Sequence, residues 1–213
     1  MEKPLDKSPE FERAFDLLEH GTSNLFLTGK AGTGKSTFLQ YFREHTEKNV
    51  VVVAPTGVAA LNVHGQTIHS FFRFKPRFVD ATSIKPDRRK LLKKIDILII
   101  DEISMVRADV FEGIEKTLRL SGPKPDQPFG GVQICVIGDL YQLPPIVSRD
   151  EAGFFAQYYD SPFFYSTPAY QAAEHTLLDQ RLFMVSGSQY QALLEMLDRP
   201  ESDNPGLADL FSR

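Results

Sequence analysis

The sequence has very little cysteine and no long hydrophobic run. Cys135 is the one cysteine among 213 residues, which excludes a disulfide framework and fits a reducing compartment. It stands in a strand-like run, so we expect a buried core thiol. No apolar stretch approaches the roughly 20 residues of a membrane-spanning helix, and residues 1–9 carry no signal or transit pattern. We therefore expect a cytoplasmic protein with no membrane contact.

Metal-ligand spacings and an excess of positive charge are absent as well. The five histidines form no ligand spacing with Cys135 or with carboxylates, so we predict no structural metal. The formal net charge is -4, so nucleic-acid binding would have to come from local patches. A chain of this length holds one domain or slightly more and can bury a hydrophobic core without disulfides or structural metals.

The strongest signal that is present is a phosphate-binding loop. Residues 29–36 read Gly-Lys-Ala-Gly-Thr-Gly-Lys-Ser and fit G-x-x-x-x-G-K-[ST] without a mismatch. An apolar run over 24–28 predicts a strand before the loop, and a helical pattern opens at Ser36, which is the context that the motif requires. The alternative is a glycine-rich turn that contains Lys and Ser by chance, and these flanks disfavour it.

Glycines allow the backbone of such a loop to wrap a phosphate, because no Cβ blocks the approach. Lys35 is expected to reach the β- and γ-phosphates of ATP, and the Ser36 hydroxyl to hold Mg²⁺. The residues expected to contact the nucleotide are Gly29, Ala31, Gly32, Thr33, Gly34, Lys35, Ser36 and Thr37.

Two carboxylates follow a second apolar run directly. Residues 95–100 predict a buried strand, and Asp101 and Glu102 come next. Burying carboxylates at the end of a central strand costs free energy unless a cation or hydrogen-bond donors pair with them. Beside a phosphate loop, Asp101 would bind the Mg²⁺ shell and Glu102 would act as general base on the attacking water. The alternative is a cap at the start of the helical segment that follows.

Polar residues also follow two later segments. Gln142 lies on the loop after the predicted strand 132–137, at the binding edge of a parallel sheet, where it could sense the γ-phosphate. Arg181 follows a predicted strand at 175–179, where it could reach the nucleotide. A satisfied loop amide and an ordinary surface arginine remain the alternatives.

The order of predicted elements gives the fold class. Strands and helices alternate, which predicts an α/β fold with a mostly parallel sheet. The expected helices are 10–20, 36–45, 58–63, 108–120 and 189–197, and the expected strands are 24–28, 49–54, 95–100, 132–137 and 175–179.

A basic segment interrupts this alternation. Between Arg73 and Lys94 nine basic residues face only two aspartates, and phenylalanines stand at 72, 74 and 78. Exposed aromatics beside basic residues suit a single-stranded nucleic acid, because charges follow phosphates and rings stack on bases. The alternative is a solvated charged loop whose phenylalanines lie in the core.

Together these motifs resemble the Pif family of superfamily-one DNA helicases, with weaker similarity to the RecD-like branch. The resemblance covers roughly residues 20–148 in the family's order. Besides the phosphate loop, it rests on residues 54–60, 67–71, 100–106, 128–133 and 138–145.

The resemblance implies a RecA-like ATPase domain that uses ATP and Mg²⁺ for 5′-to-3′ translocation on single-stranded DNA. It implies duplex or G-quadruplex junctions as partners, a monomer, a nucleoid association if the source is prokaryotic, and roles in repair, recombination and telomere maintenance. By position, Lys35, Glu102, Gln142 and Arg181 would be catalytic. The residues expected to contact the single strand are Thr56, Gly57, Thr67, His69, Phe72, Arg73 and Lys75.

The resemblance also divides the chain. Residues 1–73 and 95–181 would form the ATPase domain, residues 74–94 a small wedge insertion, and residues 182–213 a tail or the start of a second motor domain. We expect the chain to be an N-terminal motor half with weak ATPase activity. The family's adenine-reading glutamine is missing near Phe11, whose ring could stack on the base instead. A phosphate-loop kinase, a nucleotide switch and a non-catalytic nucleotide-binding domain are the competing functions.

Overall fold

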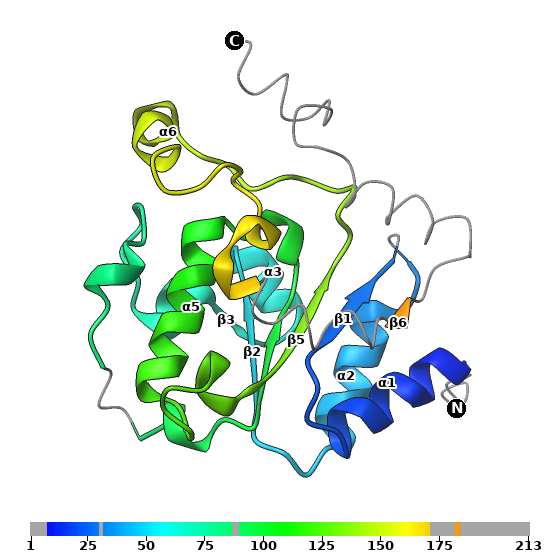
Figure 1. The fold of residues 1–213 in the computed structure, drawn as a ribbon. Coiled ribbons are helices and arrows are strands. Elements are labelled where there is room, and N and C mark those ends of the chain that lie inside the picture. Colours follow the sequence, from blue (N-terminus) through cyan, green and yellow to red (C-terminus); the bar gives the residue numbers. More distant parts are fainter. Residues whose placement is uncertain (1–7, 30–31, 87–89, 171–181, 184–213) are drawn as a thin grey trace.

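The computed structural model describes residues 8–29, 32–86, 90–170 and 182–183. A parallel sheet of six strands runs through the middle, in the order β3-β2-β4-β5-β1-β6. The strands are β1 (Leu25–Thr28), β2 (Val50–Ala54), β3 (Gln66–Thr67), β4 (Ile97–Ile100), β5 (Gln133–Gly138) and β6 (Leu182–Phe183). Figure 1 shows the sheet with helices packed around it. The prediction of an α/β fold with a parallel sheet is confirmed.

The α-helices alternate with the strands along the chain. They are α1 (Pro9–Glu19), α2 (Lys35–His45), α3 (Gly57–Asn62), α4 (Ile68–Phe72), α5 (Ala108–Ser121) and α6 (Arg149–Phe155). Ser8 caps α1 by accepting a hydrogen bond from the Phe11 N–H at 3.2 Å. Every helix among the described residues is too short or too polar to span a lipid bilayer.

Strand side chains alternate between two hydrophobic cores. In β4, Ile97 and Ile99 pack with α1 and α2, whereas Leu98 and Ile100 pack with α5 on the opposite face. In β5, Cys135 belongs to the core on the side of α1 and α2 and has no exposed surface. Both faces of the sheet are therefore covered, as parallel sheets require. The expected buried thiol is confirmed, and burial raises the pKa of Cys135 far above its usual range.

The basic segment between α4 and β4 lies along the outer side of α5 (Figure 1). It contains two short 3₁₀ turns, Ala81–Ser83 and Leu92–Lys94. Contact with α5 is close, because a Cβ built on Gly113 would lie 2.6 Å from a Val79 methyl carbon. The segment is thus an excursion from the sheet that packs back on α5.

Elements expected from the sequence agree with the structure over residues 9–138 to within about two residues at each end. Four helices and strands were not expected: β3, α4, α6 and β6. The predicted strand at 175–179 and helix at 189–197 lie outside the described residues.

Truncating Leu98 to alanine is expected to lower the free energy of unfolding by about 2–5 kcal/mol, because a cavity would remain in the core. Leu98 is fully buried in the central strand β4. Urea unfolding followed by circular dichroism measures the change. Val58→Ala is the matched control: this side chain is 72% exposed on α3, so its loss should leave stability nearly unchanged. Equal effects of the two substitutions would contradict the assignment of the core.

Candidate active site

The strand order brings three chemically important segments to one edge of the sheet. Strands β4, β5 and β1 are neighbours, and Thr28 of β1 pairs with Gly138 of β5. All three end at the same edge because they are parallel. The loop 29–34 follows β1, Asp101 follows β4, and Asp139 follows β5. This edge is where open parallel sheets bind ligands.

The phosphate loop leads into α2 through a left-handed glycine. Gly34 has φ 90° and caps the helix without a side chain, a conformation that glycine adopts at little cost. The Lys35 amine donates a hydrogen bond to the Gly29 carbonyl, so its side chain folds back over the loop. Ser36 and Thr37 are exposed on the first turn of α2 and border a cavity of about 610 Å³. Ala31 lies outside the described residues.

Asp101 and Glu102 directly follow β4, and both are half-buried. Burial raises the pKa of Asp101 to about 6, the neighbouring Glu102 adds to the rise, and Lys35 opposes it. The Asp101 N–H still bonds to the Val53 carbonyl at 2.9 Å, so its backbone belongs to the sheet. Glu102 has φ 52°, in the left-handed region. Its side chain makes no capping hydrogen bond to the turn that follows, so the capping alternative gains no support.

These residues suit a magnesium ion. Mg²⁺ prefers oxygen ligands and is usually held by one or two protein groups together with phosphates. The Asp101 carboxylate and the Ser36 hydroxyl supply two such oxygens at the same edge of the sheet. A half-buried carboxylate whose pKa is raised gains from a nearby cation. Within the described ranges, no cluster of three His, Cys, Asp or Glu side chains could hold a metal ion without added ligands.

Gln142 is positioned by a residue that the sequence did not single out. Its side-chain amide donates to Asp139 Oδ2 at 3.2 Å, and its backbone N–H donates to the Asp139 carbonyl at 3.0 Å. The other Asp139 oxygen accepts the Tyr141 N–H at 3.0 Å. Asp139 is 7% exposed, whereas Gln142 is exposed. Asp139 therefore holds the loop that presents Gln142, and its place directly after a buried strand was the available signal.

The residues expected to contact a single strand divide into exposed and structural groups. Gly57, Arg73 and Lys75 are exposed. Thr56 and Thr67 are half-buried and cap α3 and α4, with side chains that accept the N–H groups of the residues three positions later at 3.2 Å. Their hydroxyl oxygens are therefore used as helix caps.

His69 lies on α4, half-buried beside the start of the basic segment. Its backbone carbonyl accepts the Phe74 N–H at 3.0 Å, and the two rings are 6.4 Å apart. Burial lowers the pKa of His69, which favours the neutral ring. A neutral imidazole offers a hydrogen bond to a polynucleotide but no charge.

Two aromatic residues are placed differently from the prediction. Phe72 is 4% exposed and stacks on Phe74 with centroids 5.5 Å apart, so its ring belongs to the core and is not presented to a base. Phe11 is 5% exposed and meets Phe38 and Tyr41 edge to face. Its packing between α1 and α2 explains why it is aromatic without a bound base. Arg181 lies outside the described residues.

Comparison with known proteins shows what this arrangement resembles. The family model described as PIF1-like helicase matches residues 10–161. A second model, described as antitoxin TacA 1-like, matches residues 163–213, most of which lie outside the described residues.

Among curated proteins, the ATP-dependent DNA helicase Pif1 of a Psychrobacter species is 38% identical over 149 residues, which cover 65% of this chain and 22% of the relative. The ATP-dependent DNA helicase PIF1 of Saccharomyces cerevisiae is 39% identical over 158 residues, covering 69% of this chain and 18% of the relative. The chain thus spans about a fifth of the length of these two relatives.

Solved structures agree with the sequence matches. A structure of Pif1 helicases unwinding forked double-stranded DNA has a TM-score of 0.76 and 36% identity, covering 85% of this chain and 44% of that chain. Pif1 helicase from Bacteroides, in complex with ADP-AlF3 and single-stranded DNA, has a TM-score of 0.71 and 40% identity. The match covers 77% of this chain and 39% of that chain.

Proposed function

We propose, on the premise that the chain belongs to the PIF1-like helicase family, that it is the ATP- and single-strand-binding motor part of an ATP-dependent DNA helicase. The observation that carries this proposal is the shared edge of β1, β4 and β5, which places the phosphate loop beside Asp101 and Glu102. The RecA-like fold and the similarity to DNA-bound relatives support it.

Each residue of the site has a separate task in hydrolysis. The loop N–H groups and the Lys35 amine bind the phosphates, and Lys35 stabilises the charge that develops during transfer. Ser36 and Asp101 would hold Mg²⁺, which would neutralise phosphate charge when bound. Glu102, whose side chain is not used as a cap, accepts the proton of the attacking water. Gln142, fixed by Asp139, contacts the γ-phosphate.

The single strand would lie on the exposed surface between α3 and the basic segment. Gly57, Arg73 and Lys75 are exposed there, and basic side chains bind phosphates without reading sequence. The phenylalanines at 72, 74 and 78 contribute less than their spacing suggested, because Phe72 is in the core and Phe74 stacks on it. Binding should therefore depend on charge more than on base stacking.

Further features of the proposal come from the family. They are 5′-to-3′ movement, duplex or G-quadruplex junctions as substrates, a monomer, and a place in the cytoplasm or at a bacterial nucleoid. Residues 74–94 would act as a wedge on the duplex. The similarity to Pif1 helicases solved at forked double-stranded DNA supports the wedge and the duplex junction.

The proposal predicts that labelled oligothymidylate binds this chain and that a non-hydrolysable ATP analogue with Mg²⁺ changes the dissociation constant. Fluorescence anisotropy measures both. Affinity should fall steeply as salt rises, because released counterions drive the binding. The double variant Arg73→Gln, Lys75→Gln should reduce the salt dependence, whereas Arg13→Gln, exposed on α1, should not. No binding at low salt would overturn the proposal.

A further inference from the structure

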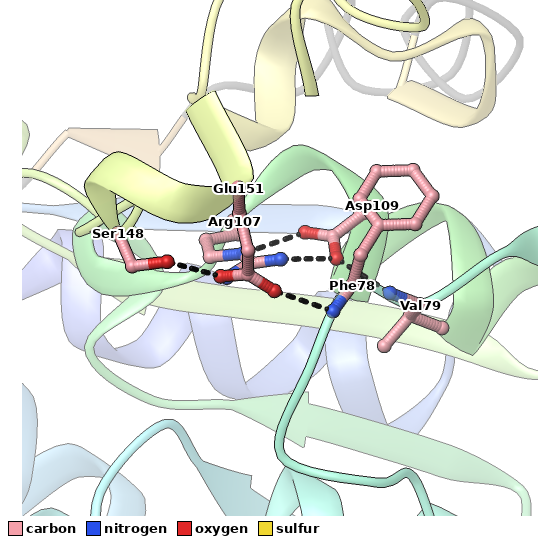
Figure 2. A network of polar contacts seen from close by, with 6 residues as sticks. All are labelled: Phe78, Val79, Arg107, Asp109, Ser148 and Glu151. Carbon is pink, nitrogen blue, oxygen red and sulfur yellow. Dashed lines mark hydrogen bonds and ion pairs between the residues drawn. The ribbon is translucent and has the colours of Figure 1, made fainter. Parts of the chain in front are cut away.

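Three charged side chains join the basic segment, the start of α5 and α6 (Figure 2). Arg107 precedes α5 and donates two hydrogen bonds to Asp109, from Nε to Oδ1 at 2.9 Å and from Nη2 to Oδ2 at 2.6 Å. Its third contact, from Nη1 to Glu151 Oε2 at 3.0 Å, reaches α6. One guanidinium therefore bridges two carboxylates from different elements. We name Arg107, Asp109 and Glu151 the arginine clamp.

The two carboxylates of the arginine clamp also hold consecutive backbone amides of the basic segment. The Val79 N–H donates to Asp109 Oδ2 at 2.8 Å, and the Phe78 N–H donates to Glu151 Oε1 at 2.8 Å. Ser148 adds a hydroxyl donor to Glu151 Oε2 at 3.0 Å. The basic segment is thus fixed at two adjacent peptide groups, and both depend on the same arginine.

Burial makes this arrangement sensitive to the identity of the cation. The Asp109 side chain has no exposed surface, and Arg107 and Glu151 are 16% and 25% exposed. A planar guanidinium can serve both carboxylates at once, whereas a lysine ammonium is a point charge. The Phe78 ring packs against α6, with its centroid 6.0 Å from that of Phe155, and Arg107 lies 5.6 Å above the Phe155 ring.

The arginine clamp is also close in the chain to the hydrolytic carboxylates. Arg107 is five residues after Glu102, and the residues between them form a short 3₁₀ turn. The turn is held by hydrogen bonds from Met105 N–H to the Glu102 carbonyl at 3.1 Å and from Val106 N–H to Ile103 at 3.0 Å. Ile103 and Val106 are buried. Because this turn is hydrogen-bonded and buried, a displacement of the Glu102 backbone would displace Arg107 as well.

We propose that Arg107 is a positioning residue that couples the ATP site to the basic segment. Resting on the proposed function, the inference is that nucleotide-dependent movement of Glu102 alters the arginine clamp and, through Phe78 and Val79, the surface that binds single-stranded DNA. No part of the hydrolysis chemistry needs Arg107, because it points toward α6 and the basic segment.

The test compares the chain with Arg107→Lys and Glu151→Gln variants. Fluorescence anisotropy gives the dissociation constant for oligothymidylate with and without a non-hydrolysable ATP analogue and Mg²⁺, and the ratio of the two constants is the coupling factor. Nucleotide affinity is measured separately with a fluorescent analogue. Arg119→Lys is the matched control, since Arg119 pairs with the buried Glu115 at 2.6 Å near the other end of α5.

In the unmodified chain we expect a coupling factor of about 5–150-fold, the usual range for linked sites. Arg107→Lys and Glu151→Gln should bring it to within about twofold of one and leave nucleotide affinity unchanged, as a selective loss of linkage requires. Arg119→Lys should retain it. A coupling factor that survives in Arg107→Lys overturns the inference. So does a parallel loss of both affinities together with a lower melting temperature, because that indicates a merely structural role.

Failure of the proposed function looks different, because then the unmodified chain does not bind oligothymidylate either. Hydrogen exchange at the Phe78 and Val79 amides decides the inference in that case. A change in their protection on nucleotide binding that Arg107→Lys abolishes supports the coupling. Protection that does not respond to nucleotide, or responds equally in both proteins, overturns it.

Discussion

Replacing Lys35 with alanine is expected to reduce the rate of ATP hydrolysis by about 10²–10³-fold, the usual effect of removing one preorganised donor from a transition state. The structure gives the reason. The Lys35 amine already lies over the phosphate loop, on the Gly29 carbonyl, and its charge acts on Asp101. The substitution removes a positive charge where negative charge develops. Phosphate release from saturating ATP measures the rate.

Lys124→Ala is the control for this experiment. Lys124 is exposed on the loop before β5, at the opposite edge of the sheet, so the same change in charge should leave hydrolysis unchanged. Circular dichroism should show that both variants keep the fold, because Lys35 lies on the first turn of α2 and outside the cores. A Lys35→Ala variant that hydrolyses ATP at the original rate would remove the phosphate loop from the proposed mechanism.

Replacing Glu102 with glutamine should separate binding from hydrolysis. We expect the rate to fall by about 10²–10⁴-fold, since a glutamine cannot accept the proton of the attacking water. Nucleotide affinity should change little, because the amide has the size of the carboxylate and the Glu102 side chain does not cap the following turn. Single-turnover hydrolysis and titration with a fluorescent ATP analogue measure the two quantities.

Glu47→Gln supplies the comparison, because this exposed residue lies between α2 and β2, away from the carboxyl edge of the sheet. It should hydrolyse ATP at the unmodified rate. Two results would count against Glu102 as the base: an unchanged rate in Glu102→Gln, or a fall in rate that comes entirely from weaker nucleotide binding.

The succession of the main helices and strands along the chain could be predicted because its signals are local. Four of the strands are continuous apolar runs, and the glycine loop carries its own motif. By contrast, β3 has two residues and α4 has five, which is too short for a pattern to stand out. The helix α4 depends on the Thr67 cap and on burial of Ile68, Phe71 and Phe72, and the spacing of these three was the signal that could have placed Phe72 in the core.

Other parts of the site could not be predicted, because they join residues that are far apart in the chain. Arg107 and Glu151 are separated by 44 positions, and each alone resembles an ordinary surface charge. Only packing shows that Asp109, within an amphipathic helix, is fully buried and needs the guanidinium. The Asp139 contact to Gln142 is local, but a sequence does not show which way a loop amide turns.

The complete burial of Cys135 has a practical consequence for measuring movement of the basic segment. The single thiol of the chain is enclosed between the sheet and its helices and is rarely ionised, so maleimide dyes have no reactive target in the native fold. A cysteine introduced at an exposed position such as Lys75 would carry the only fluorophore. The fluorescence of that label could then report movement of the basic segment without first removing a native thiol.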